Sequence, residues 1–450
     1  MARPIDGDFR FLYLPVETKA REYDAKLLLT LVALRANFQV VFGPKWLLLT
    51  NLGRLPRGFF GFKTLNRMDA SLMPAAIQRG HAVIGWDEEG PGQIVPEIYL
   101  KSINAEAVRH TQRIFAWGDH QAKALKGRFP DAASKIEVAG NPRWDILRPE
   151  HRGYFDAEAQ ALRAKYGRFI LINTNFSTYN ACFEEGVGAI SKIAAATGTF
   201  KQDDAGDQDM LSRIHTFEQG TFESYAAVLP VLSRTFPGHT IIVRPHPTEQ
   251  HDRWREICAP LPNVRAVYEG FVIPWIIAAE AVVQNSCTTG VEALTLGKPV
   301  VSYCKYDTPA LEWHLANQVC PRVHDEAALV EFLSRFTADP SGFSAFNAGR
   351  RSVLSHHIAK LSGETSSAAI VKSLLFLANK CEKTGMQFDR AYPFGKVLEG
   401  YHKTDYMELK FPEVSSDALH QRVTRLSQSI PLPACEVTQI ANSCFLFRRK

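Results

Sequence analysis

The stretch AVVQNSCTTGVEALTLGKPVVSY, residues 281–303, contains two apolar strand segments joined by an amphipathic helix. The first strand, around Val282 and Val283, runs into the small and polar residues Ser286 to Gly290. Gly297-Lys298-Pro299 separates the helix from the second strand. Three hydroxyls and the backbone N–H groups of a helix start suit an anion. The stretch therefore predicts a strand–helix–strand unit with an anion site at its turn.

The same alternation of strand and helix runs along most of the chain. Apolar segments at 9–16, 38–43 and 81–86 alternate with helical ones, and a second series starts at 168–175. This alternation predicts the α/β class, with doubly wound parallel sheets of the Rossmann type. In such sheets ligands bind beyond the carboxyl ends of the strands.

The length of 450 residues is too great for one ordinary core, so we expect two domains. The pattern breaks near residues 150–168, which places an N-terminal acceptor or catalytic domain at 1–160 and a nucleotide-binding domain at 161–380. The two domains are expected to face a central cleft. Residues 381–450 are expected to form a helical tail that packs back on the N-terminal domain.

The composition is that of a soluble globular enzyme, with 46% hydrophobic and 22% charged residues. Charges of both signs are mixed and the net charge is only +5, which argues against nucleic-acid binding. The eight cysteines show no metal-binding spacing, which indicates reduced thiols and a cytoplasmic location. Every apolar run is shorter than the roughly 20 residues that span a bilayer, so any membrane contact is expected to be peripheral.

Acidic residues follow two strands of the first domain. Asp87, Glu88 and Glu89 come directly after the strand at 81–86, and crowding raises the pKa of at least one such acid into the range of a general acid or base. A solvated acidic turn is the alternative. After the strand at 135–140, Asp145 is either a nucleophile or the salt-bridge partner of Arg143.

Two strand ends of the second domain suit a phosphate. In Arg244-Pro245-His246-Pro247 the prolines stiffen the turn, and a rigid His beside an Arg favours a phosphate oxygen over a backbone partner. In the opening stretch the threonines either hold phosphate or cap the helix, and Glu292 accepts from a ribose or complements the helix dipole. The expected nucleotide-binding residues are Arg244, His246, Pro247, Gln284, Asn285, Ser286, Thr288, Thr289, Gly290 and Glu292.

Phosphate binders in one domain and carboxylates in the other predict a transferase. At these motifs the chain resembles a known group of enzymes. RPHPTE followed by QNSCTTGVEALTLGKPVVSY resembles the nucleotide-binding half of bacterial surface-polysaccharide glycosyltransferases with the GT-B fold. FLYLPVETKAREYDAKLLL and VAGNPRWDILRPE resemble surface carbohydrate biosynthesis proteins, which are related to the retaining β-Kdo transferases of capsule, O-antigen and lipopolysaccharide assembly. Glu88-Glu89-Gly90 and His246-Pro247 are similar to two motifs shared with bacterial sialyltransferases.

The resemblance implies transfer of Kdo, a 3-deoxy-ulosonic acid, from CMP-Kdo to a lipid-linked or oligosaccharide acceptor. It implies that His246 and the turn 286–290 bind the CMP, and that Glu88 or Glu89 is the acid/base. Asp145 is the candidate nucleophile of a covalent intermediate, with Asp87 in reserve. The carboxylates of the donor or acceptor would pair with Arg143, Lys19 and Arg21, although the latter two also fit an ordinary charged helix start.

The sequence contains no Asp-x-Asp motif and no metal-ligand cluster, so we expect no cofactor and metal-independent turnover. Three alternatives remain open. One is a glycerophosphotransferase that uses CDP-glycerol, and a second is a transferase for another CMP-ulosonic acid such as sialic acid. The third is a non-catalytic nucleotide-sugar sensor, which would not need the acidic residues of the first domain.

Overall fold

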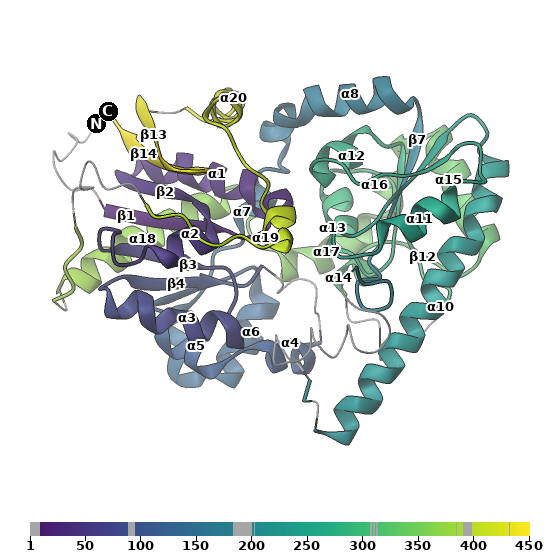
Figure 1. Ribbon diagram of the computed structural model, residues 1–450. Helices are drawn as coiled ribbons and strands as arrows, with labels where there is room; N and C mark the ends of the chain where they lie inside the picture. Colours follow the sequence, from purple (N-terminus) through teal and green to yellow (C-terminus); the bar gives the residue numbers. More distant parts are fainter. Residues whose placement is uncertain are drawn as a thin grey trace. The chain divides into compact units, whose positions relative to one another are not determined.

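The computed structural model describes residues 10–88, 95–182, 200–201, 203–306, 308, 311, 314–383, 385–389, 398–431 and 433–450. The chain divides into two compact units, each with its own sheet (Figure 1). Unit 1 comprises Met1–Glu88, Ile103–Tyr154 and His357–Lys450, and unit 2 comprises Glu89–Ser102 and Phe155–His356. Two Rossmann-like doubly wound sheets confirm the predicted α/β fold class.

Unit 1 contains an eight-stranded sheet in the order β13-β14-β2-β1-β3-β4-β5-β6. The strands from β2 to β6 are parallel, and β1, β2 and β3 are buried along their whole length, as expected where helices cover both faces. The strands are β1 (Arg10–Val16), β2 (Phe38–Pro44), β3 (Gly58–Phe62), β4 (Ala82–Trp86), β5 (Arg113–Ala116), β6 (Ile136–Val138), β13 (Cys435–Ala441) and β14 (Cys444–Arg449).

The helices of unit 1 come from both halves of the chain, and α1 packs against α7 and α18. They are α1 (Lys19–Arg35), α2 (Lys45–Thr50), α3 (Arg67–Gln78), α5 (Ala105–His110), α6 (Asp119–Arg128), α7 (Pro142–Asp145), α18 (Ser366–Lys383), α19 (Asp405–Lys410) and α20 (Ser416–Ser427). Short 3-10 helices lie at Pro130–Lys135 and Pro149–Phe155.

The observed units differ from the domain bounds expected from the sequence. Helix α18 belongs to unit 1 rather than to the nucleotide-binding domain, because it packs on α1 and α7. The last 50 or so residues do not form a purely helical tail. They end in the hairpin β13–β14, and β14 pairs antiparallel with β2 at the edge of the sheet (Figure 1).

Unit 2 contains a six-stranded parallel sheet in the order β12-β11-β10-β7-β8-β9. Its strands are β7 (Phe169–Asn173), β8 (Thr240–Arg244), β9 (Val264–Ala266), β10 (Ala281–Gln284), β11 (Val300–Tyr303) and β12 (Arg322–Val323). Its helices are α4 (Pro96–Ser102), α8 (Asp156–Tyr166), α10 (Ala205–Thr235), α11 (His251–Cys258), α12 (Val272–Ala278), α13 (Thr288–Thr295), α14 (Leu315–Val319), α15 (Glu326–Ala338), α16 (Phe343–Phe346) and α17 (Ala348–His357), with a 3-10 turn at Pro340–Gly342.

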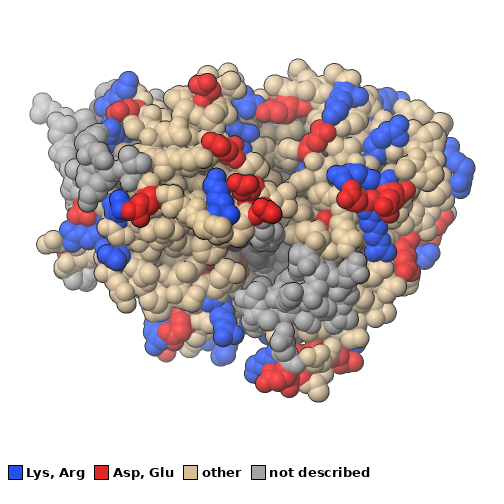
Figure 2. All heavy atoms as spheres, viewed as in Figure 1, with Lys and Arg blue, Asp and Glu red and all other residues tan. Residues whose placement is uncertain are grey.

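The surface agrees with the mixed charge pattern of the sequence. On the face shown in Figure 2, Lys and Arg side chains are interspersed with Asp and Glu. Within the described ranges, no helix is both long enough and apolar enough to cross a bilayer.

Candidate functional site

The sheet of unit 1 has a topological switch point between β1 and β3. Strand β1 has β2 on one side and β3 on the other, so the crossover direction reverses there. In open α/β sheets ligands bind outside the carboxyl ends of the strands at such a point. The residues that follow these strands are charged: Glu17 after β1, Lys45 after β2 and Lys63 after β3.

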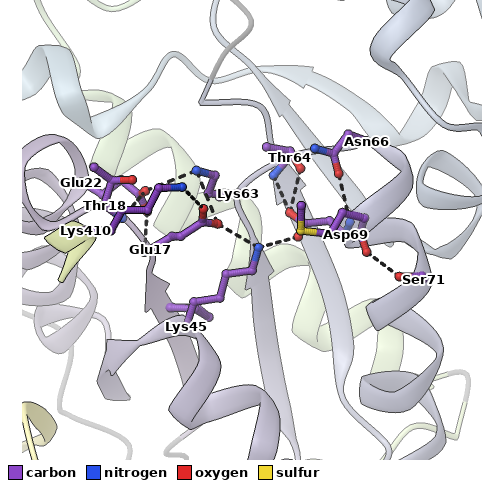
Figure 3. Close-up of polar contacts among 12 residues, drawn as sticks. Glu17, Thr18, Glu22, Lys45, Lys63, Thr64, Asn66, Asp69, Ser71 and Lys410 are labelled. Carbon is purple, nitrogen blue, oxygen red and sulfur yellow. Dashed lines mark hydrogen bonds and ion pairs between the residues drawn. The ribbon is translucent and has the colours of Figure 1, made fainter. Parts of the chain in front are cut away.

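These charged side chains form one cluster, to which Lys410 of α19 contributes (Figure 3). One oxygen of Glu17, Oε2, lies 3.0 Å from Lys45 Nζ and 3.5 Å from Lys63 Nζ. The other oxygen, Oε1, accepts a hydrogen bond of 3.0 Å from Lys410 Nζ. We call Glu17, Lys45, Lys63 and Lys410 the Glu17 cluster.

The cluster keeps its charges. Burial alone would raise the pKa of Glu17, but Lys63, Lys45 and Lys410 outweigh it and hold the pKa well below its usual range. Burial lowers the pKa of Lys45, but Asp69 (2.7 Å) and Glu17 raise it more. The Glu17 carboxylate is therefore an ionised acceptor near neutral pH, not a general base.

Glu22 fixes the backbone of the turn between β1 and α1. Its carboxylate accepts from the backbone N–H groups of Thr18 at 3.0 Å and Glu17 at 3.3 Å, and from Lys26 Nζ at 2.7 Å. Burial opposes its ionisation, yet Lys26 and Lys63 lower the pKa of Glu22 to about 2. The first strand–helix turn is thus held by ion pairs rather than by glycines.

The expected acidic loop begins at the same edge of the sheet. The Glu88 carboxylate accepts a hydrogen bond of 2.7 Å from Trp86 Nε1, and the Glu88 N–H donates to the Lys63 carbonyl at 2.9 Å. Asp87 and Glu88 are each only 5% exposed, so neither forms a solvated acidic turn. Glu89 lies outside the described residues. The structure therefore brings Glu88 next to the Glu17 cluster.

Asp145 lies inside unit 1, at the start of α18. Its side chain is fully buried and accepts from the Ser366 N–H at 2.8 Å and from the Ser367 N–H and Oγ at 2.7 Å. Burial raises the pKa of Asp145, while these hydrogen bonds oppose the shift. Arg148, not Arg143, is the basic group beside it, at 3.9 Å. These contacts engage both carboxylate oxygens of Asp145 at the start of α18 and give the residue a helix-capping role.

The three basic residues expected to bind carboxylates lie on two helices that pack together, Lys19 and Arg21 on α1 and Arg143 on α7. Arg143 is buried, with its guanidinium 5.9 Å from the ring of Trp144. Lys19 Nζ donates to the carbonyls of residues 412–413, at 3.3 Å each, and Arg21 is half-buried on α1. Lys45 and Lys63, which the sequence analysis did not select, directly follow β2 and β3 at the switch point.

The sheet of unit 2 has its switch point between β7 and β10. Beside it, Glu249 organises the turn that carries His246. Glu249 is 1% exposed, and its two oxygens accept from the His246 N–H (2.9 Å), Thr174 Oγ1 (2.7 Å) and Trp254 Nε1 (2.8 Å). His246 Nδ1 lies 2.8 Å from Thr248 Oγ1, which fixes the direction of the ring.

The Arg244 side chain is engaged by other residues of unit 2. It is buried, its guanidinium lies 4.8 Å from the ring of Tyr268, and it donates to the carbonyls of residues 269–270 at 3.3 and 2.7 Å. Burial lowers its pKa to about 10. Arg244 therefore ties β8 to the loop after β9, while His246 and the half-buried Pro247 continue into the turn.

The turn after β10 is held by amide side chains. Ser286 has φ of +45°, and its Oγ accepts from Asn317 Nδ2 at 3.0 Å. Asn175 donates to the Ser286 carbonyl at 3.0 Å, and its own N–H donates to Asn285 Oδ1 at 3.1 Å. These bonds join the carboxyl ends of β7 and β10, so the predicted turn and the end of β7 form one polar edge.

The first turn of α13 follows directly. Gln284 is fully buried and accepts from the Cys287 N–H at 2.8 Å, which gives it a structural role. A Cβ on Gly290 would lie 2.9 Å from the Gln284 side chain, so any larger residue there would displace Gln284 or the helix start. Thr288 and Thr289 are half-buried, and Thr289 Oγ1 is buried without a hydrogen-bond partner in the described part of the chain. Glu292 is buried one turn further on.

A carboxyl group with a shifted pKa lies near the His246 turn. Glu218 of α10 accepts from the backbone N–H groups of Thr178 and Tyr179, at 3.2 and 3.1 Å. Burial raises the pKa of Glu218 to about 7, with the Glu249 carboxylate adding to the effect. Sequence reasoning did not select several residues that build the two edges, namely Glu17, Lys45, Lys63, Asn175, Glu218, Glu249, Asn317 and Lys410.

The fold is similar to that of solved carbohydrate enzymes. UDP-GlcNAc 2-epimerase from Methanocaldococcus jannaschii, in complex with UDP-GlcNAc and UDP, matches with a TM-score of 0.50 and 12% identity, over 81% of this chain and 99% of that one. The Neisseria meningitidis UDP-GlcNAc 2-epimerase gives 0.49 and 13%, over 82% and 99%. The wall teichoic acid polymerase TagF gives 0.49 and 9%, over 83% and 89%. No protein-family model matches the sequence, and no curated protein sequence is significantly similar to it. The first similarity shows the GT-B type of fold.

Proposed function

We propose that this protein is a glycosyltransferase that transfers an ulosonic acid, Kdo in the simplest case, from its CMP-linked form to a glycan of a surface polysaccharide. The observation that supports it most is the polar edge of unit 2. There the His246 turn and the Ser286 turn each bond to the end of β7, beside the switch point of a Rossmann-like sheet: Glu249 accepts from Thr174 and from the His246 N–H, and Asn175 donates to the Ser286 carbonyl.

The chemistry of this edge fits one phosphate. His246 offers a ring nitrogen, and the first turn of α13 offers backbone N–H groups and the Thr289 hydroxyl. A CMP-sugar carries a single phosphate, so this donor set can hold it without a bridging metal. In the proposal His246 and the α13 turn hold the CMP, and no cofactor takes part.

The proposed acid/base and nucleophile are among the residues that follow β4. Glu88 is fixed by Trp86 beside the Glu17 cluster, and it or the following Glu89 would protonate or deprotonate the reacting oxygen. Asp87 is then the remaining candidate for a nucleophile, since Asp145 caps α18. The acceptor would be an oligosaccharide or a lipid-linked glycan, reached at the cytoplasmic face of a membrane.

A panel of nucleotides tests the proposal. CMP, CMP-Kdo, CMP-sialic acid, CDP-glycerol and UDP-GlcNAc are screened by thermal shift, since a ligand of the folded state raises its apparent stability. Binders are then assayed for release of CMP in the presence of acceptor glycans. We expect binding of CMP and turnover of CMP-Kdo by the wild type. His246→Ala should lose CMP binding, whereas His420→Ala, an exposed histidine of α20, should keep it.

The alternatives give different results in the same panel. Consumption of CDP-glycerol but not of CMP-Kdo would establish a glycerophosphotransferase. Turnover of CMP-sialic acid alone would change the donor but not the reaction class. Binding of CMP without any turnover would indicate a sensor, and binding of UDP-GlcNAc alone would refute the cytidine assignment.

A further inference from the structure

Lys410 and Glu17 are 393 residues apart in sequence and 3.0 Å apart in space. Lys410 is the last residue of α19 and donates to the Oε1 atom of Glu17 at the β1–β3 switch point (Figure 3). The C-terminal segment, residues 398–450, thus places a charge at the ligand edge of a sheet that starts at Arg10. A tail that only covered the surface would not need to reach this position.

Contacts with α1 fix the chain next to Lys410. Tyr23 of α1 packs against Phe411, with ring centroids 6.1 Å apart, and Lys19 Nζ bonds to the carbonyls of residues 412–413. Farther along, Arg422 of α20 pairs with Asp24. Three residues of α1 therefore hold the segment on the C-terminal side of Lys410.

Glu17 is suited to a ligand that donates hydrogen bonds. An ionised carboxylate is an acceptor only, with about four lone-pair positions on its two oxygens. Lys45 and Lys410 each occupy one position at 3.0 Å, and the Glu17 side chain retains 15% exposure. A sugar hydroxyl can donate to such a group, whereas an ionised carboxylate or phosphate has no hydrogen to donate to it.

We propose that Lys410 is a positioning residue of the unit 1 site, which holds Glu17 so that its carboxylate accepts hydrogen bonds from hydroxyls of the acceptor sugar. The inference rests on the proposed function, because that function defines which ligand is the acceptor. Through Lys410, the C-terminal segment then contributes to the acceptor site.

The charges around Glu17 assign it to binding rather than to proton transfer. The ammonium groups of Lys45, Lys63 and Lys410 lie 3.0–3.5 Å from its carboxylate oxygens. Lys63 also pairs with Glu22, and Lys45 with Asp69. Because the three ammonium groups hold the pKa of Glu17 well below its usual range, its ionisation is constant near neutral pH. Loss of Lys410 should consequently alter affinity for the acceptor and leave the chemical step alone.

Three variants test this role: Lys410→Met, Lys410→Arg and, as a matched control in the same segment, Lys403→Met. Initial rates of CMP release are measured against acceptor concentration, using the glycoside that the wild type uses best. We expect Lys410→Met to raise the acceptor KM about tenfold, the effect of one hydrogen bond to a charged group, with kcat and the Kd for CMP unchanged. Lys410→Arg should restore most of the affinity, and Lys403→Met should equal the wild type.

A double-mutant cycle separates positioning from general damage. In a Glu17→Gln background, Lys410→Met should add little to the KM, because the group that it positions is already altered. Equal effects of Lys410→Met in both backgrounds, or an unchanged KM, would overturn the inference. A melting temperature for each variant identifies any that fail to fold, and Lys410→Arg then carries the comparison.

The proposed function and this inference can fail separately. If the wild type turns over no nucleotide sugar, the glycoside panel is titrated directly into wild type and Lys410→Met by calorimetry. A glycoside that binds the wild type and binds Lys410→Met more weakly would keep the inference and reject the transferase. Equal binding to both proteins, or no glycoside binding to the wild type, would reject the inference.

Discussion

Asp145 accepts a hydrogen bond of 2.8 Å from the backbone N–H of Ser366, across 221 residues of sequence. A residue from the first third of the chain therefore caps a helix that follows unit 2. Because α18 packs on α1, unit 1 combines segments that precede and follow residues 155–356 in the sequence. The contact accounts for the burial of Asp145, the residue that its place after a strand made a candidate nucleophile.

Replacement of Asp145 by Ala should destabilise unit 1 by about 2 kcal/mol, because two N–H groups at the start of α18 lose their acceptor. Urea unfolding measures the loss, and Asp131→Ala, at an exposed position, serves as the control. Intact mass after incubation with CMP-Kdo adds a second readout. A sugar adduct on the wild type that disappears in a stable Asp145→Ala protein would restore Asp145 as the nucleophile.

Glu249→Ala should weaken CMP binding at least tenfold through the His246 turn. The change removes the acceptor of four donors, and each donor that stays buried and unpaired costs about 1–3 kcal/mol, so the turn must rearrange. Calorimetric titration with CMP gives the affinity. Glu256→Ala, on the exposed face of α11, should bind CMP as the wild type does. Normal CMP affinity in Glu249→Ala would show that the turn does not touch the nucleotide.

Glu218 should make stability depend on pH around neutrality. Its pKa is about 7 in the folded protein and that of an ordinary glutamate, 4.5, when unfolded, so the native state binds the extra proton between these values. Its contribution is fully present below about pH 4.5 and is lost as the pH rises through 7. Urea unfolding across this range should show a smaller decline in Glu218→Gln than in the wild type. Glu223→Gln, exposed on the same helix, should follow the wild type.

Gly290→Ala should cost about 1–3 kcal/mol and reduce CMP affinity. Its new Cβ would lie 2.9 Å from the side chain of Gln284, and this overpacking would displace the first turn of α13. Gly349→Ala is the control, because no atom lies within 4 Å of its added Cβ. Thermal unfolding and CMP titration report the two effects, and full stability with normal affinity would contradict the close packing.

Turnover of CMP-Kdo should be insensitive to EDTA, since the donor carries one phosphate and His246 with the α13 turn are proposed to hold it. The assay compares CMP release before and after chelation, and after addition of magnesium. Activity that disappears with EDTA and returns with magnesium would show that a divalent cation takes part.

The sequence predicted the parts of the fold that depend on local pattern. Alternating apolar and helical segments identified the α/β class, and the polar turn at Ser286 does follow a buried strand. The division into units was not predictable in the same way, because α18 joins unit 1 through the long-range contact with Asp145. No local signal marks such a cap.

Sequence could select only those residues of the candidate site that stand out locally, as polar or rigid residues directly after a strand. His246 and the Ser286 turn stood out because rigid or polar residues end a strand. Glu17, Lys45 and Lys63 also follow strands, but charged residues at a helix start have an ordinary explanation. Their meaning depends on the order of strands in the sheet, and Lys410 reaches them only through tertiary packing.

The antiparallel pairing of β14 with β2 has a consequence for biosynthesis. Strand β2 leaves the ribosome early, yet the partner that covers its edge lies at Cys444–Arg449. Until those residues are translated, β2 presents unpaired backbone groups that can recruit another chain. Deletion of β14 should therefore favour aggregation over a smaller soluble product.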